Sequence, residues 1–167
     1  IYYGIETGSP SLLKIISKGA TASGMIEGLI KAHEAGIKTS ATVILGLGGQ
    51  GMWQSHIDET AALLSQAPVN YLSTLQLVLE PEREADFLSR FDPPFHFQDD
   101  QGILEEQRRL LSQLIDLPKR ALFRSNHASN ALALAGTLPK DRERLLGEID
   151  GARSGHRSLR PHWLRSL

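Results

Sequence analysis

The change from strand-forming residues to glycine in the sequence TVILGLGGQG, residues 42–51, constrains the fold more than any other feature. The stretch begins with a β-branched, apolar run and then has four glycines in six positions. Glycines directly after a strand are typical of a tight turn into a helix, or of a place where a ligand approaches the backbone closely. The spacing Gly46-x-Gly48-x-x-Gly51 also fits a dinucleotide-binding fingerprint. The neighbouring sequence has to decide between these interpretations.

Strand-like and helix-like segments alternate on both sides of the glycines. Aromatic and β-branched runs predict the strands, and apolar residues at helical spacing predict the helices. The predicted strands are residues 1–5, 37–45 and 69–79, and the predicted helices are residues 11–17, 21–35 and 52–66, with Thr21 as the cap of the second. The order β-α-α-β-α-β predicts a parallel sheet with helices outside it. Because the strand at 37–45 is apolar on both parities, we expect both faces of this sheet to be covered.

The second half of the chain has a different pattern, and we place a boundary between residues 1–90 and a mainly helical carboxyl-terminal extension, residues 91–167. The extension is predicted to contain an irregular connection at 91–101, a helix at 103–117, a short strand at 122–124, a polar loop or helix start at 125–130, a charged helix at 139–149 and an arginine-rich tail at 151–167. The helix at 103–117 is strongly amphipathic. Its predicted inward residues are Leu104, Leu111, Leu114 and Ile115, and its predicted outward residues are Glu105, Glu106, Arg108 and Arg109.

Composition narrows the function classes. The net charge of -1 gives no basic field for nucleic acid, and no apolar run approaches the roughly 18 residues of a membrane span, so neither partner is predicted. The chain has no cysteine, which excludes disulfides and thiolate-held clusters within it and favours a cytoplasmic protein. His156 and His162 lack neighbouring metal ligands in the sequence, so no metal site is predicted. Because the chain begins inside a strand-like run, we expect it to be a fragment whose amino-terminal part is missing.

Three longer segments resemble a known family: YYGIETGSPSLLKIISKGAT, AHEAGIKTSATVILGLGG and LEPEREADF. Together they resemble the later half of radical S-adenosylmethionine (radical SAM) enzymes, in the branch that includes methylthiotransferase-like and oxygen-independent coproporphyrinogen-oxidase-like proteins. In that family one strand ends in Gly-(Ile/Val)-(Glu/Gln)-(Ser/Thr)-Gly, and a later strand ends in Gly-x-Ile-x-Gly-x-x-Glu. Ile44 and Gly46 match the second pattern, whereas Thr42 replaces its first glycine and Gly49 stands where glutamate is expected. The segments FRSNHASN, GTLPKDRERLLGEID and LRPHWLRSL extend the resemblance over nearly the whole chain.

The resemblance implies an α/β fold that is the later half of a partial (β/α)6 TIM-type barrel, with parallel strands, followed by the extension. Family members hold a 4Fe-4S cluster on a Cys-x3-Cys-x2-Cys loop near their first strand. The cluster, reduced by an electron donor, cleaves S-adenosylmethionine to a deoxyadenosyl radical that abstracts hydrogen from the substrate. The resemblance therefore implies an iron-sulfur, metal-binding oxidoreductase whose small-molecule substrate is unknown. This chain has no cysteine and holds no cluster, so we expect it to be inactive without the missing amino-terminal half of the barrel.

Seven residues become binding candidates through this resemblance. The cofactor candidates are Glu6, Thr7, Ile44, Gly46 and Leu47, and the substrate candidates are Gln76 and His127. The first two follow the first strand and would face the methionine or ribose part of the cofactor, where a carboxylate suits hydroxyl and ammonium groups. The next three would pack on the adenine ring.

Each candidate also has a purely structural interpretation. Thr7 fits a turn that prepares a helix start at Ser9, and Gly46 fits a strand-to-helix turn. Gln76 fits a polar pair inside the sheet, and His127 fits a capping cluster with its serine and asparagine neighbours. We expect the arginine-rich tail to be solvated. The residues His33, His56 and His96 are predicted to lie on helix faces or in loops.

Two other function classes remain open. In a dinucleotide-binding domain of the Rossmann type, Gly46, Gly48 and Gly51 would hold a pyrophosphate and Glu80 a ribose. Glu80 lies 29 residues after Gly51, later than the usual roughly 20, and the glycines follow a second strand rather than a first. A non-catalytic binding module would also fit a chain without cysteine. Strand order separates the first two classes, because a barrel requires sequential order whereas a dinucleotide fold reverses direction from its first strand.

Overall fold

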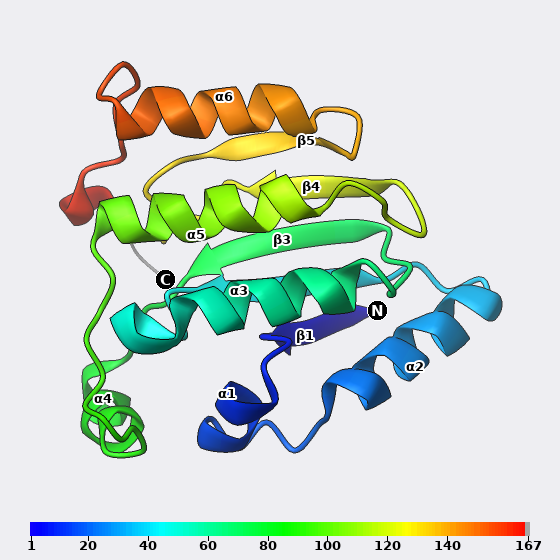
Figure 1. Cartoon of the computed structure of the whole chain (residues 1–167), viewed down its shortest axis with the longest axis horizontal. Helices are drawn as coiled ribbons and strands as arrows, with labels where there is room; N and C mark the ends of the chain where they lie inside the picture. Colours follow the sequence, from blue (N-terminus) through cyan, green and yellow to red (C-terminus); the bar gives the residue numbers. More distant parts are fainter. Residues whose placement is uncertain (166–167) are drawn as a thin grey trace.

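The computed structural model describes residues 1–165, which form one five-stranded sheet with helices packed against it (Figure 1). The strands are β1 (Tyr2–Glu6), β2 (Ser40–Leu45), β3 (Tyr71–Gln76), β4 (Ala121–Ser125) and β5 (Leu134–Leu138). The helices are α1 (Pro10–Ile15), α2 (Ala22–Glu34), α3 (Gly49–Leu64), α4 (Pro81–Leu88), α5 (Asp100–Gln113), α6 (Arg142–Arg153) and the 3-10 helix η1 (His162–Leu164).

The strand order is sequential, β1-β2-β3-β4-β5, and the first four strands run parallel to their neighbours. The predicted three parallel, sequentially ordered strands are therefore confirmed, although β2 and β3 are shorter than predicted. The short strand predicted at 122–124 is β4, which pairs with β3 and so joins the same sheet. Phe123 of β4 also belongs to the same apolar core as Leu72 of β3. The sheet and its core thus continue across the boundary expected at residue 90.

Three elements were not predicted: α4, β5 and the short 3-10 helix η1. α4 begins at Pro81, which suits the first turn of a helix, and its few apolar residues gather on one side, but the helix is only 8 residues long and none of them is buried. β5 pairs antiparallel with β4, and its sequence LAGTL has small residues and a glycine in place of a β-branched run. β5 is therefore held by its pairing with β4 rather than by its own sequence preference.

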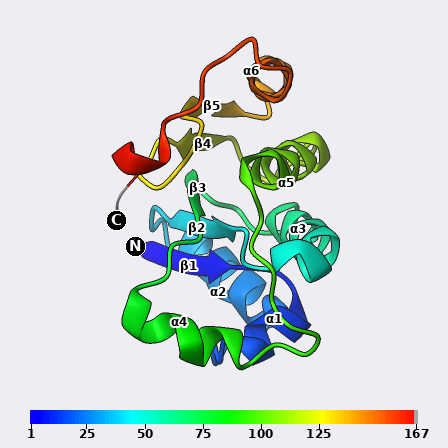
Figure 2. The same ribbon diagram turned by 90° about the vertical axis from the view of Figure 1, so that its left-hand side faces the viewer.

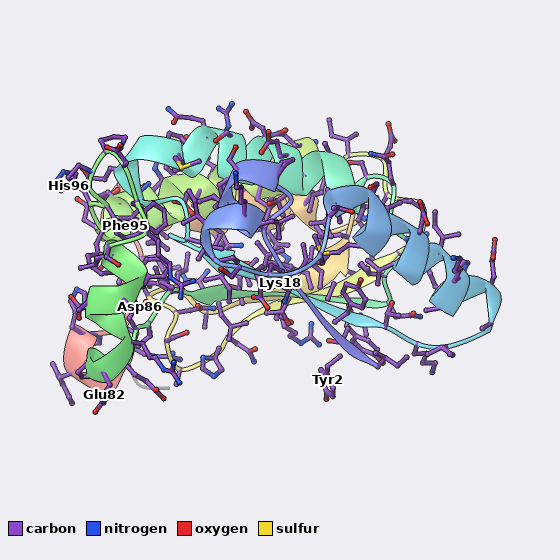
Figure 3. All side chains as sticks on the ribbon, turned by 90° about the horizontal axis from the view of Figure 1, so that it is seen from below. Tyr2, Lys18, Glu82, Asp86, Phe95 and His96 are labelled. Atoms are coloured by element: carbon purple, nitrogen blue, oxygen red, sulfur yellow. The ribbon has the colours of Figure 1, made fainter. Side chains whose placement is uncertain are left out.

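Helices α3, α5 and α6 cover one face of the sheet (Figure 2). On β2 the burial alternates, with Ala41 and Val43 buried on the helix side and Thr42 and Ile44 only partly buried on the other. Tyr2 projects away from the helices and is 91% exposed (Figure 3). The expectation that both faces are covered is therefore wrong for the part of the chain that the structure describes. The expectation was based on the apolar residues at both odd and even positions of β2. On the uncovered face, Ile44 lines an open pocket instead of packing against a second layer of helices.

Helix α5 departs from its predicted orientation at two residues. Leu104, Leu111 and Leu114 are buried, as predicted. Ile115 is 55% exposed, because the helix ends at Gln113 and the chain turns outward. Glu106, predicted to face solvent, is fully buried. A buried carboxylate needs hydrogen-bond partners, and those of Glu106 are in the glycine loop and in the connection before α5.

Candidate functional site

A cavity of about 290 Å³ lies at the carboxyl ends of β1, β2 and β3. Five of the seven predicted site residues line it: Glu6, Ile44, Leu47, Gln76 and His127. Apolar side chains, among them Phe87 of α4, form most of the remaining wall. A larger hollow of about 580 Å³ lies between α1 and the start of α2, but it holds none of the predicted residues. The carboxyl edge of parallel strands is where α/β proteins bind ligands, so the smaller cavity is the candidate site.

Glu6 lies at the end of β1 and lines the cavity. Its φ of 61° lies in the left-handed region, which is strained for a residue other than glycine. The side chain folds back over Gly4, where a Cβ atom would lie only 2.2 Å from Glu6 Oε1. There it forms an ion pair with Lys18 at 3.1 Å. The register between β1 and β2 shifts at the same place, so the strand end is shaped around this carboxylate.

Thr7 does not line the cavity, because it is fully buried under the loop that follows β1. Its Oγ1 accepts a hydrogen bond from the Ser9 amide at 2.9 Å and lies 2.8 Å from Nδ1 of His56. The Nε2 atom of His56 lies 2.9 Å from the Ile44 carbonyl oxygen, which only accepts. Nε2 therefore carries the hydrogen and Nδ1 accepts the Thr7 hydroxyl proton. These contacts match the structural interpretation of Thr7, with its link to the Ser9 helix start.

His56 is the first residue that sequence reasoning missed. It lies on helix α3, as predicted, but its ring is fully buried and joins the ends of β1 and β2. Burial lowers the pKa of His56 to about 4, and its hydrogen bond to the Ile44 carbonyl opposes that shift only partly. The neutral ring thus ties the loop that follows Glu6 to the carbonyl of Ile44. Nothing in the local sequence distinguishes it from a surface histidine.

The glycine loop between β2 and α3 is packed against its own chain. Gly46 has a φ of 80°, and a Cβ atom there would lie 2.9 Å from Cδ1 of Ile103 in α5. Gly49 has a φ of 52°, and a Cβ atom there would lie 2.7 Å from the His96 carbonyl oxygen. Figure 3 shows Phe95 and His96 beside the start of α3. Positive φ and close contacts with the chain itself therefore account for these two glycines.

The amide groups of this loop already have acceptors within the chain. Gly46 N–H donates to Oε2 of Glu106 at 2.6 Å, and Gln50 N–H donates to the His96 carbonyl at 2.9 Å. A pyrophosphate bound in the dinucleotide mode needs such amides at the start of the helix. Together with the sequential strand order, this weighs against the dinucleotide interpretation. Gly46 itself does not line the cavity, whereas Ile44 and Leu47 on either side of it do.

Glu106 is the second residue that sequence reasoning missed. Its Oε1 accepts a hydrogen bond from Nε2 of Gln98 at 3.1 Å, while Oε2 accepts the Gly46 amide. Burial raises the pKa of Glu106 to about 7, although both hydrogen bonds favour the charged form. The carboxylate therefore connects α5, the connection before it and the glycine loop. A glutamate on an amphipathic helix gives no sequence signal that it turns inward.

Gln76 lies at the end of β3, where the Asn130 side chain makes the backbone hydrogen bonds that a neighbouring strand makes elsewhere in the sheet. The Gln76 amide N–H donates to Oδ1 of Asn130 at 2.7 Å, and Nδ2 of Asn130 donates to the Thr74 carbonyl at 2.7 Å. The side-chain Oε1 of Gln76 is buried and has no hydrogen-bond partner among residues 1–165. It is thus a buried acceptor of a cavity-lining residue whose hydrogen bond is not made within the described residues.

His127 lies in the loop after β4 and is exposed to the cavity. Its Nδ1 lies 2.9 Å from Oγ of Ser129, and the Ser129 amide lies 3.2 Å from the same atom. No helix begins at residues 125–130, so the prediction of a helix-capping cluster is wrong, and the contacts with Ser129 close a turn in the loop that lines the cavity.

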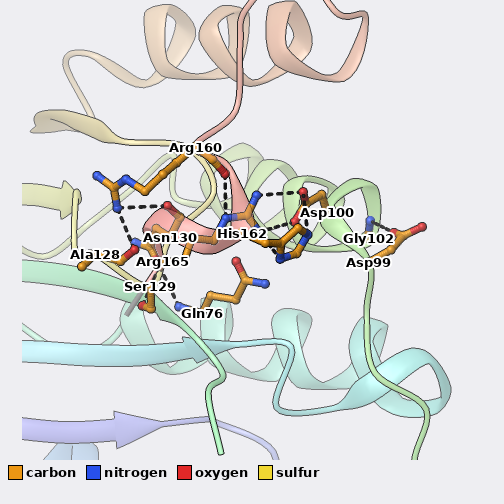
Figure 4. A network of polar contacts seen from close by, with 10 residues as sticks. All are labelled: Gln76, Asp99, Asp100, Gly102, Ala128, Ser129, Asn130, Arg160, His162 and Arg165. Atoms are coloured by element: carbon orange, nitrogen blue, oxygen red, sulfur yellow. Dashed lines mark hydrogen bonds and ion pairs between the residues drawn. The ribbon is translucent and has the colours of Figure 1, made fainter. Parts of the chain in front are cut away.

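Four arginines of the arginine-rich tail, at positions 153, 157, 160 and 165, bond to the body, so the expectation of a solvated tail is wrong for these residues. Arg165 forms a bidentate ion pair with Asp100 at the start of α5, at 2.6 and 2.9 Å. Arg160 donates to backbone carbonyls of the loop that carries His127 (Figure 4). The sequence signal for this was only the density of arginines near the end of the chain.

Residues 1–165 contain no group of three or more histidine or acidic side chains placed to hold a metal ion. Within the same residues, no helix is both long and apolar enough to cross a membrane. Comparison with known proteins finds no protein-family model and no curated protein sequence that matches this chain.

Proposed function

We propose that this chain is the later half of a radical S-adenosylmethionine barrel and that the cavity at the ends of β1, β2 and β3 binds part of S-adenosylmethionine. The observation that carries the proposal is the meeting of Glu6, Ile44 and Leu47 in one cavity. These residues were chosen for the cofactor by family resemblance, and they come from two strand ends separated by about forty residues of sequence. The sequential parallel strands and the uncovered sheet face are also what half of a barrel requires.

Five residues that line the cavity suit such a ligand. The apolar walls at Ile44, Leu47 and Phe87 suit the faces of an adenine ring. The Glu6 carboxylate suits a ribose hydroxyl or the α-ammonium group. Oε1 of Gln76 still needs a donor. Gly46 and Thr7 support the cavity from behind, since their own polar groups are bonded within the chain.

The residues of this chain do not fit an iron-sulfur cluster, because no thiolate exists to hold one. In the proposed enzyme the cluster, the electron donor and the radical step belong to the missing half of the barrel, and this chain alone is inactive. Its own residues bind and orient the cofactor, and the small-molecule substrate is of unknown identity. We place such an enzyme in the cytoplasm.

Calorimetric titration of the chain with S-adenosylmethionine tests this proposal. We expect Glu6→Gln to weaken binding by roughly ten- to a hundredfold, since it removes a charge-assisted hydrogen bond of the kind worth about 1.5–3 kcal/mol. Glu82→Gln is the matched control, because Glu82 lies in the first turn of α4 and does not line the cavity. Absence of any binding by the folded wild-type chain, or equal losses in the two variants, would contradict the assignment of the cavity to this cofactor.

A non-catalytic binding module is the second candidate, and the missing cysteines are the observation that favours it. The two candidates use the same cavity but differ in what the complete protein contains. An upstream Cys-x3-Cys-x2-Cys loop in the gene, with a cluster in the full-length protein, supports the enzyme. A full-length protein without that loop supports the module.

A further inference from the structure

The ring nitrogens of His127 are assigned by the groups around them. A backbone amide only donates, so the contact between the Ser129 amide and Nδ1 makes Nδ1 the unprotonated nitrogen. The hydrogen of the neutral ring is then on Nε2, and no hydrogen-bond partner of Nε2 occurs within the described part of the chain. Because the ring lines the cavity, it offers a ligand a donor in a set tautomer.

Several backbone carbonyls of the loop that carries His127 contact the guanidinium group of Arg160. Nη1 of Arg160 lies 2.8 Å from the His127 carbonyl oxygen, 2.8 Å from that of Ala128 and 3.3 Å from that of Asn130. The Arg160 amide also donates to the Ala131 carbonyl at 2.7 Å. Four of the five carbonyls of residues 127–131, all except that of Ser129, therefore bond to Arg160. Charge-assisted bonds of this kind are stronger than bonds between neutral groups, so Arg160 fixes the course of this loop.

Arg160 is itself held by the segment that follows it. Nε of Arg165 donates to the Arg160 carbonyl at 2.8 Å, and the same guanidinium is paired with Asp100 in α5. Figure 4 shows Arg160 and Arg165 on either side of η1, with Gln76 and Asn130 beneath them. The segment from Arg160 to Arg165 is thus anchored to the sheet-end loop at one side and to α5 at the other.

We infer that Arg160 is a positioning residue of the cavity: it holds the 127–130 loop so that Nε2–H of His127 is presented to a hydrogen-bond acceptor of the ligand. The inference rests on the proposed function only in taking the cavity as the ligand site. It specifies the ligand further, since the group that meets His127 carries an acceptor such as a carbonyl oxygen, a carboxylate or an unprotonated ring nitrogen. All three side-chain contacts come from Nη1, which lies one bond further from the backbone than a lysine ammonium does, so lysine does not place its nitrogen among the same carbonyls.

Nitrogen NMR of the His127 ring tests the positioning directly. In the wild-type chain, Nδ1 is expected to resonate as an unprotonated nitrogen and Nε2 as a protonated one. In Arg160→Gln and Arg160→Lys, the two signals are expected to move toward one another as the ring exchanges between tautomers. Arg157→Gln is the control, because Arg157 bonds to Glu148 and Ala133 but not to the 127–130 loop. Unchanged signals in a folded Arg160 variant would overturn the inference, and so would the opposite tautomer in the wild-type chain, even if both variants fail to fold.

Titration with S-adenosylmethionine adds a second readout. We expect His127→Gln and Arg160→Gln each to weaken binding by about five- to tenfold, and the double variant to bind no more weakly than His127→Gln alone. Losses that multiply in the double variant would show that Arg160 acts independently of His127, and would overturn its positioning role. If the wild-type chain does not bind this ligand, the proposed cofactor is wrong, and the NMR measurement still decides the role of Arg160.

Discussion

Replacing Glu106 by glutamine should change how the stability of the chain depends on pH. The pKa of Glu106 is raised by burial from its ordinary value of 4.5 to about 7. A raised pKa means that the folded state holds a proton which the unfolded state has released. The stabilising contribution is therefore complete below about pH 4.5 and is lost as the pH rises through 7. A difference of about 2.5 pKa units corresponds to about 3 kcal/mol of unfolding free energy.

His56 acts in the opposite direction over an overlapping range. Burial lowers its pKa from 6.5 to about 4, so the unfolded state binds a proton that the folded state does not. Its contribution is complete above about pH 6.5 and is lost as the pH falls toward 4. In the wild-type chain the two groups largely cancel between pH 4.5 and 6.5. Without Glu106, the loss caused by His56 on acidification remains uncompensated.

Glu106→Gln keeps an acceptor for the Gly46 amide, and the Gln98 amide can rotate to offer its oxygen to the new amino group. Urea unfolding of both proteins from pH 4.5 to 8 gives the free-energy difference between them. We expect this difference to shift in favour of the variant by about 3 kcal/mol across the range, since His56 contributes equally to both proteins.

The control for this measurement is Glu105→Gln, one residue earlier on α5, where the side chain pairs with Arg153 near the surface. We expect it to keep the wild-type pH profile. A difference between Glu106→Gln and the wild type that stays constant with pH would refute the reasoning. It would mean that the buried carboxylate does not carry a proton at neutral pH.

Two further predictions concern the packing behind the cavity. Gly46→Ala should lower the free energy of unfolding by about 1–3 kcal/mol, because its φ is 80° and the new methyl meets Ile103; urea unfolding measures this, and Ile103→Val in the same chain should restore part of the loss. His56→Leu should cost about 2–4 kcal/mol, because it leaves the Thr7 hydroxyl and the Ile44 carbonyl buried without their partner. In a double-mutant cycle with Thr7→Val the losses should be clearly less than additive, and full additivity would contradict the shared network.

The arrangement of the first half of the fold could be predicted because its signals are local and repeated. Each strand of β1, β2 and β3 is bounded by glycine, proline or a capping residue, and each helix has apolar residues at helical spacing. Parallel strands joined by right-handed crossovers then place their carboxyl ends together. The pattern thus places the ends of β1 and β2, with Glu6 and Ile44, at one edge of the sheet, whereas Gln76 was predicted within a longer third strand and reaches that edge because β3 ends there.

The residues that were missed depend on partners far away in the sequence. Glu106 meets Gly46 across 60 residues, and His56 meets Thr7 across 49. Amphipathic patterning places a glutamate or a histidine outward by default, since burial is unfavourable unless partners exist. The sequence of α5 or α3 alone does not contain those partners. The same applies to Arg160, whose carbonyl acceptors are about 30 residues earlier in the chain.

The glycines that follow β2 bear on the cavity indirectly. Positive φ and the contacts with Ile103 and His96 explain why Gly46 and Gly49 cannot carry side chains, without any ligand. Yet the turn that they make possible separates Ile44 and Leu47, which both line the cavity, by only two residues. Glu106 holds the middle of that turn through the Gly46 amide. A change in this turn therefore affects a bound ligand through the positions of Ile44 and Leu47. The groups that come close to the glycine backbone belong to α5 and to the connection before it, not to a ligand.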